Sequence, residues 1–172
     1  MHTYSSFRAS HKQAGFTLVE LVTVILILGV LAAVALPKYA DLQGKAREAK
    51  VKTVAGSMKA AAGLVKAAAL VNLGTCSAAT AGTVSMEGTS IALNHCYPQA
   101  LGNFATGILA AANVTAADSW QISPTRPGGA AVGTALTIQL TDAATPANCS
   151  ITYTSPAATN TPSSVTRTLT GC

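Results

Sequence analysis

The spacing of apolar residues changes along this chain, and its first pattern is a nearly unbroken apolar run. The run covers residues 16–36, and Glu20 is the only charged residue within it. A helix of this length rises roughly 32 Å, which is about the thickness of the hydrocarbon core of a bilayer. The run therefore predicts a membrane-spanning helix.

After Pro37 the apolar residues recur at spacings of three and four, which is the period of one helix face. They are Val51, Val54, Met58, Ala61, Val65 and Ala68. Proline in a helix interior favours a kink rather than an end, whereas Asn72 and Gly74 supply a C-terminal stop. We expect one helix over residues 16–72, roughly 85 Å long, whose second half packs on the rest of the chain.

Residues 73–172, the predicted globular head, are rich in Ser, Thr, Ala and Gly, and their apolar residues alternate with polar ones. The alternation predicts strands at 119–123, 135–141, 148–154 and 164–170, with weaker ones at 83–86 and 90–93. A short helix is expected over 108–113, and Pro124, Pro127 and Gly128 mark a loop. Short polar links favour an antiparallel sheet with one face on the long helix. The predicted fold class is therefore α+β.

Charge is sparse and unevenly placed. Only 10% of the residues are charged, and the formal net charge is +5. Seven of the 11 lysines and arginines lie in residues 38–66, so the basic excess belongs to one helix. Tyr39 is the one aromatic residue among them, which is not the aromatic interleaving of a nucleic-acid-binding surface, and no specific nucleic acid partner is predicted. Residues 1–15 form a short leader whose Arg8 and Lys12 favour the cytoplasmic side, and we exclude it from the fold.

The four cysteines all follow the apolar run, at Cys76, Cys96, Cys149 and Cys172. None forms a C-x-x-C motif, which argues against metal and redox sites, and disulfides need an oxidising compartment. Catalysis finds no support, because the only histidine after the leader is His95 and its neighbour Cys96 is expected to be oxidised. The acids lack metal-ligand spacing. We therefore predict no enzyme activity, no cofactor and no metal, and we expect Trp120 and Tyr153 in the core.

Glu20 needs an explanation of its own. An acid inside a membrane-length run costs on the order of 3 kcal/mol unless it is paired or protonated. No Lys or Arg lies within the run, so a partner must come from another chain or from an α-amino group made by proteolysis. A cut between Gly15 and Phe16 would place such an amine four residues away. A secretory signal peptide does not fit, because the run is too long and leads into Pro37 and a charged helix.

The sequence Gly15-Phe16-Thr17-Leu18-Val19-Glu20, followed by the apolar run to Pro37, resembles the class III signal of type IV prepilins. The resemblance implies that a prepilin peptidase cuts after Gly15 at the cytoplasmic membrane face and N-methylates Phe16. Glu20 would then neutralise the Phe16 amine of an adjacent subunit during filament assembly. The resemblance also implies that the helix between Gly29 and Pro37 loses order when subunits pack. The alternative at this stretch is an ordinary single-pass anchor.

The protein implied by this resemblance is a structural subunit, a major pilin, that polymerises through its N-terminal helix into a surface fibre for adhesion or motility. Its partners would be the membrane, the prepilin peptidase, an inner-membrane assembly platform and further pilin copies. Before assembly it would be an inner-membrane single-pass protein with a cytoplasmic leader and a periplasmic head, and afterwards part of an extracellular pilus. Alternatives are a minor pilin, a pseudopilin of a type II secretion system, and a non-assembling single-pass sensor or adhesin. The sequence leaves open whether the fibre serves adhesion, twitching, DNA uptake or surface sensing.

Parts of the head also resemble pilins of the mannose-sensitive haemagglutinin type. These parts are Met86-Glu87-Gly88 through Ile91, Tyr97-Pro98-Gln99-Ala100, Gly107-Ile108, Asn148-Cys149-Ser150-Ile151-Thr152-Tyr153 and the terminal Gly171-Cys172. Four cysteines allow three pairings. We favour Cys149–Cys172, because a C-terminal disulfide-bounded loop is typical of pilins, together with Cys76–Cys96. Each would contribute on the order of 3 kcal/mol. The Ser/Thr/Pro-rich residues 154–166 form either an exposed loop or a site for O-glycans.

Overall fold

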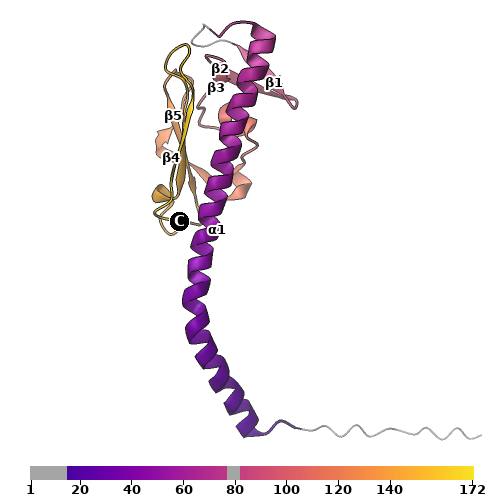
Figure 1. Ribbon diagram of the computed structural model, residues 1–172, viewed down its shortest axis with the longest axis vertical. Helices are drawn as coiled ribbons and strands as arrows, with labels where there is room; N and C mark the ends of the chain where they lie inside the picture. Colours follow the sequence, from indigo (N-terminus) through magenta and orange to yellow (C-terminus); the bar gives the residue numbers. More distant parts are fainter. Residues whose placement is uncertain (1–14, 77–81) are drawn as a thin grey trace, which may run out of the picture. The chain divides into compact units, whose positions relative to one another are not determined.

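The structure, a computed structural model, describes residues 15–76 and 82–172. It divides into a unit that ends at Asp41 and a second unit from Leu42 to Cys172. Helix α1, Leu18–Leu73, contributes to both units and is drawn from indigo to magenta in Figure 1. Apart from Gly15, the predicted leader lies outside the described residues.

In the first unit, α1 is apolar and its side chains are exposed. The large apolar side chains from Leu18 to Leu36 expose between 39% and 78% of their surface. By length and composition this part of α1 can cross a membrane. The helix continues through Pro37, which lacks an N–H and so leaves one carbonyl of the preceding turn without its helical donor.

In the second unit, α1 buries one face against the strands. Its buried residues are Val51, Ala55, Met58, Ala61, Ala62, Val65 and Ala69. The face is turned slightly from the predicted one, because Val54 and Ala68 are half-buried while Ala55 and Ala69 are fully covered. The helix ends one residue later than predicted. Gly74 adopts φ +69° there, and its N–H donates to the Leu70 carbonyl at 3.1 Å, as in a left-handed C-terminal cap.

The four-stranded sheet forms one wall of the larger apolar cluster. Its strands are β4 (Trp120–Pro127), β5 (Ala135–Leu140), β6 (Ser150–Thr154) and β7 (Ser164–Thr168), in that order and antiparallel throughout. The side chains on its inner face include Trp120, Leu136, Ile138, Leu140, Ile151 and Tyr153, and they form one apolar cluster with α1. Figure 1 shows this sheet alongside α1, with β7 in yellow. Trp120 and Tyr153 are core residues, as predicted.

A smaller sheet packs on the C-terminal end of α1. It contains β1 (Thr83–Met86), β2 (Thr89–Asn94) and β3 (Tyr97–Pro98), also antiparallel, and the short helix α2 (Gly107–Ala111) lies against it. A second apolar cluster contains Val65, Ala69, Val84, Ile91, Leu93 and Cys96. Single turns of 3-10 helix, η1 (Ala116–Asp118) and η2 (Pro146–Asn148), complete the elements. The α+β class is confirmed, with the head's strands in two antiparallel sheets and with β3 as a strand that the sequence did not predict.

The loop predicted at Pro124 and Pro127 is wrong, because both prolines lie within β4. The pairing of β4 with β5 shifts register between Ile122 and Pro127. Since β4 is an edge strand, prolines there cost fewer ladder hydrogen bonds than in a central strand. The predicted helix at 108–113 is shorter than expected, and Asn113 lies beyond its end with φ +52°.

Two glycines let the loop after β3 contact the end of β4. A Cβ added at Gly102 would lie 1.9 Å from the Pro127 carbonyl oxygen, and one at Gly128 would lie 2.1 Å from the Ala100 carbonyl oxygen. Only glycine permits such an approach between backbones. The contact joins the residues after the small sheet to the edge of the large one.

Candidate functional site

The first turn of α1 has the geometry of a capping box. Oε2 of Glu20 accepts hydrogen bonds from the Thr17 N–H and from the Thr17 hydroxyl, both at 2.8 Å. In return, the Glu20 N–H donates to Oγ1 of Thr17 at 3.2 Å. The sequence Thr-x-x-Glu ahead of an apolar helix is the signature of this arrangement, in which two free N–H groups of the helix start are satisfied reciprocally.

The capping box gives Glu20 a partner within its own chain. The carboxylate also lies at the positive end of the helix dipole, where negative charge is favoured. The capping hydrogen bonds and the helix dipole both lower the free-energy cost of placing an acid in the first turn of a membrane-length helix. Thr17 is a partner of Glu20 that the sequence analysis does not predict, although the three-residue spacing of Thr17 and Glu20 is a usable signal for it.

The bond between Gly15 and Phe16 lies outside the helix. Residues 15–17 have no helical assignment, and the Phe16 side chain is 88% exposed. A Cβ added at Gly15 would meet nothing within 4 Å, so no described part of the chain covers this bond. Exposed, non-helical backbone at this bond is accessible to a peptidase.

Gly29 and Pro37 both lie within α1, and neither packs against another part of the described chain. Gly29 has no atom within 4 Å of a would-be Cβ, and Pro37 is exposed. The loss of helical order expected between them concerns packed subunits, and it stays a prediction.

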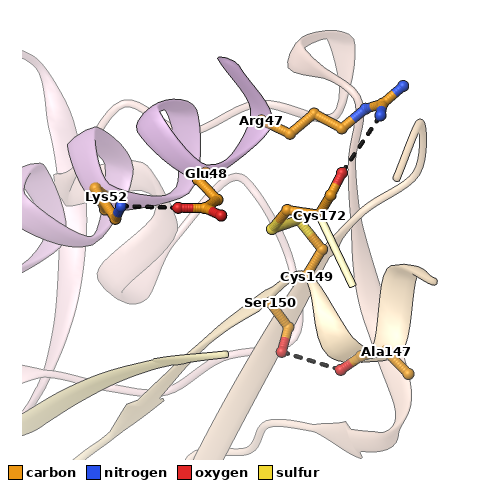
Figure 2. Close-up of a disulfide and its surroundings, with 7 residues drawn as sticks. All are labelled: Arg47, Glu48, Lys52, Ala147, Cys149, Ser150 and Cys172. Carbon is orange, nitrogen blue, oxygen red and sulfur yellow. Dashed lines mark hydrogen bonds and ion pairs between the residues drawn. A yellow bond between two sulfur atoms is a disulfide. The ribbon is translucent and has the colours of Figure 1, made fainter. Parts of the chain in front are cut away.

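The C-terminal disulfide lies against α1 at the start of the second unit. Cys149 and Cys172 are joined with a Cα–Cα distance of 4.8 Å, and Cys76 and Cys96 with 5.3 Å, which are the two pairs favoured from the sequence. Figure 2 shows Nη1 of Arg47 donating to the Cys172 carbonyl at 3.3 Å. The disulfide thus closes a C-terminal loop whose last residue is held by α1.

Figure 2 also shows two interactions beside the disulfide. On α1, Glu48 and Lys52 form an ion pair at 2.9 Å, one turn apart. Next to Cys149, the Ser150 hydroxyl donates to the Ala147 carbonyl at 3.2 Å. The ion pair supports α1 locally, and the Ser150 hydrogen bond fixes the turn between η2 and β6. Both interactions are therefore structural.

The described head holds no candidate for nucleophilic or metal chemistry. Cys96 is disulfide-bonded, and the neighbouring His95 is buried with its Nδ1 3.4 Å from the Thr159 hydroxyl. Across residues 15–76 and 82–172, no three His, Cys, Asp or Glu side chains come together in a way that could hold a metal ion.

A buried polar network, which the sequence does not predict, joins the small sheet to the loop between β4 and β5. The Asn94 amide donates to the Ala130 and Ala131 carbonyls at 3.0 and 3.2 Å. The Gln99 amide donates to the Leu93 carbonyl at 3.1 Å and to Oδ1 of Asn94 at 3.2 Å. Asn94 is 36 and 37 residues away from Ala130 and Ala131, so no local sequence pattern could have indicated these contacts. The network is structural, since its donors are satisfied internally.

Comparison with known proteins gives matches to part of the chain. The family described as "Prokaryotic N-terminal methylation motif" matches residues 10–36. The chain is 53% identical over 51 residues to the fimbrial protein EcpB of Eikenella corrodens, covering 30% of this chain and 32% of that protein. It is 49% identical over 49 residues to the type IV major pilin protein PilE1 of Neisseria gonorrhoeae, covering 28% and 30%.

A third relative is the type IV narrow pilus major component PilA5 of Thermus thermophilus, 42% identical over 50 residues, with 29% of this chain and 43% of that protein covered. The matched residues thus span about a third of the length of these relatives, and no solved structure matches the chain. The N-terminal signal predicted from Gly15 to Glu20 is confirmed. Within residues 10–36, this chain carries the N-terminal methylation motif of the type IV prepilins.

Proposed function

We propose that this chain is a structural subunit of a type IV pilus, made as a membrane-anchored precursor and polymerised into a surface fibre. The observation that carries the proposal is the Gly15–Glu20 motif at the start of a long, exposed apolar helix. The names of the matched relatives, which are fimbrial and pilin proteins, favour a pilin over a pseudopilin of a secretion system.

Maturation begins with cleavage between Gly15 and Phe16 by a prepilin peptidase, followed by N-methylation of Phe16. The bond lies in non-helical backbone ahead of the helix. Cleavage creates a positive amine at Phe16, four residues before Glu20. Before assembly, the helix stays in the inner membrane with the disulfide-bonded head in the periplasm, because disulfides form in oxidising compartments.

Assembly exchanges the partner of Glu20. In the single chain the carboxylate caps its own helix through Thr17. Between staggered subunits, it pairs with the Phe16 amine of a neighbour. Such a pair forms among apolar side chains, where an unpaired charge is costly and opposite charges attract strongly. An incoming subunit whose amine misses the carboxylate is therefore rejected, so the pair sets the stagger of the helices.

The apolar residues of α1 serve in two surroundings. They face lipid before assembly and the helices of other copies in the fibre. Helical order between Gly29 and Pro37 is the weakest part of this segment, because glycine has a low helix propensity and proline removes one hydrogen bond. We therefore place the flexible part of the packed helix there.

Two variants separate the charge of Glu20 from its capping role. Glu20→Gln keeps an oxygen that accepts from Thr17, because Gln also serves in capping boxes, but it removes the charge. Thr17→Val keeps the charge and removes the hydroxyl. Surface filaments counted by electron microscopy should fall to near background in Glu20→Gln and persist, at reduced number, in Thr17→Val.

The control is Glu87→Gln, an exposed acid in the turn between β1 and β2, which should assemble like the parent. Immunoblots check that each variant is made and that its leader is removed. Normal filaments from Glu20→Gln protein alone would refute the charge pair, and loss of filaments only in Thr17→Val would assign assembly to the cap instead.

A further inference from the structure

The capping box and the predicted cleavage bond are adjacent, and the cap decides on which side of that bond the helix begins. Thr17 is the N-cap of α1, because its carbonyl accepts the first helical backbone hydrogen bond, from the Leu21 N–H at 3.2 Å. Its hydroxyl accepts from the Glu20 N–H at 3.2 Å, which is the capping bond. The Gly15 carbonyl, on the acyl side of the bond to be cut, therefore lies two residues ahead of the first carbonyl of the helix.

The sequence also offers an earlier helix start. Ser10-His11-Lys12-Gln13, which lies outside the described residues, fits the Ser-x-x-Gln form of the same capping pattern. No proline stands between the two patterns, and a single glycine, Gly15, disfavours a helix only weakly. A helix that began at Ser10 would enclose the bond between Gly15 and Phe16. The Thr17 cap therefore selects between two starts, only one of which leaves this bond outside the helix.

Cleavage is slower where the bond lies inside a helix. In that state the Gly15 carbonyl would accept from the Val19 N–H, and the turn would have to unwind before a peptidase could reach the bond. Hydrolysis itself adds one water. Its hydroxyl oxygen joins the Gly15 carbonyl carbon as the C–N bond breaks, and the Phe16 amine takes up both protons, which leaves a carboxylate and an ammonium group.

We propose that Thr17 is a positioning residue for prepilin cleavage: by capping α1, it keeps the Gly15–Phe16 bond in non-helical backbone that the peptidase can take. The inference rests on the proposed function, to which it adds the step that prepares the substrate. The methylation motif matched over residues 10–36 puts the cleavage signal and the cap in one short stretch. Phe16, directly between the bond and the cap, is non-helical and 88% exposed. Since Thr17 acts only through the helix start, any good N-cap residue should serve in its place.

The test follows leader removal from the full-length chain, pulse-labelled in cells that make a prepilin peptidase, as the rate at which precursor becomes mature protein. Thr17→Val keeps the size and the β-branch but cannot cap, so the fraction of chains with an accessible bond falls. Its rate should drop by about fivefold, the population effect of losing one N-cap. Thr17→Ser and Thr17→Asn both cap well and should mature within about twofold of the parent rate.

Thr23→Val is the matched control. The Thr23 hydroxyl donates to the Glu20 carbonyl at 2.9 Å within the helix, so this change removes one hydroxyl bond without moving the helix start, and maturation should keep the parent rate. Maturation of Thr17→Val at the parent rate would overturn the inference. Slow Thr17→Asn beside fast Thr17→Ser would overturn it too, because the peptidase would then recognise the hydroxyl itself. A parent chain that is not cut between Gly15 and Phe16 would refute the proposed function, and this inference with it.

The helix start is measured separately, without the peptidase, from the Cα chemical shift of Phe16 in the uncleaved full chain purified in detergent. The shift should be non-helical in the parent, Thr17→Ser and Thr17→Asn, and should move toward the helical value in Thr17→Val. Non-reducing gels check that each variant forms both disulfides of its head. An unchanged Phe16 shift in Thr17→Val would count against the inference even where cleavage is slow.

Discussion

At the scale of single residues, Tyr153 shows how a polar atom is accommodated in the core. Its ring is fully buried, and its hydroxyl donates to the Pro98 carbonyl at 2.7 Å. Burial raises the pKa of Tyr153 above its usual value, because the phenolate would lose its hydration there. This one bond connects β6 of the large sheet with β3 of the small sheet.

Tyr153→Phe should lower the free energy of unfolding by about 1–2 kcal/mol, because the Pro98 carbonyl is left unsatisfied. Denaturant titration of the full chain in detergent, with its disulfides intact, measures the change. A raised pKa in the folded state gives stability that is complete below the unfolded pKa of about 10 and is lost as pH rises above it. The parent should therefore lose stability above that pH more steeply than Tyr153→Phe. Parallel pH profiles would contradict the buried environment.

At the scale of elements, α1 is stabilised on one side by apolar packing and along its edges by lysines. Nζ of Lys66 lies 4.9 Å from the ring centre of Tyr97 and donates to its hydroxyl at 3.2 Å. Lys50 lies over the Trp120 ring at 5.9 Å. Part of the basic excess seen in the sequence thus borders the joint between helix and sheets, where the aliphatic stems cover apolar surface.

The edge strands of the large sheet are protected from pairing with another chain. Within β4, Pro124 and Pro127 lack the donors that a neighbouring strand would need. On β7, Arg167 lies on the core-facing side at the open edge and is exposed. Inward-pointing charges and prolines at edges are common devices against aggregation.

Removing the C-terminal disulfide should weaken the second unit more than removing its contact with α1. Cys149→Ser with Cys172→Ser opens a loop with a sequence separation of 23 and should cost about 3 kcal/mol. Arg47→Met removes only the bond to the Cys172 carbonyl and should cost about 1 kcal/mol. Urea titration followed by tryptophan fluorescence of Trp120 compares the variants. Equal costs would mean that the loop is held mainly by Arg47.

At the scale of the whole molecule, the proposed maturation predicts one mass for the chain isolated from filaments. It equals residues 16–172 with one added methyl group, less the hydrogens lost in two disulfides. Intact mass spectrometry without reductant measures it, and reduction should restore the hydrogens. A filament mass that includes residues 1–15, or that lacks the methyl group, would contradict cleavage and methylation at Phe16.

The sequence by itself determined the features that depend on neighbours along the chain. Helical spacing predicted a helix over residues 16–72, close to the observed Leu18–Leu73, and alternation located β1, β2, β5, β6 and β7. The motif from Gly15 to Glu20 could be identified from the sequence because a cleavage signal and a helix start each depend on residues only a few positions apart. The capping contact of Thr17 belongs to the same class and could have been read.

Only the tertiary structure decided the features that depend on distant residues. The way in which the two sheets are joined rests on contacts such as Asn94 with Ala131 and Tyr153 with Pro98, which local periodicity cannot encode. The extension of β4 through Pro124 depends on its place at a sheet edge, which the sequence does not state. Which residues of the large sheet point away from α1 likewise depends on the register of its four strands. Local spacing fixes which residues share an element, whereas long-range packing fixes which elements meet and which surfaces they leave open.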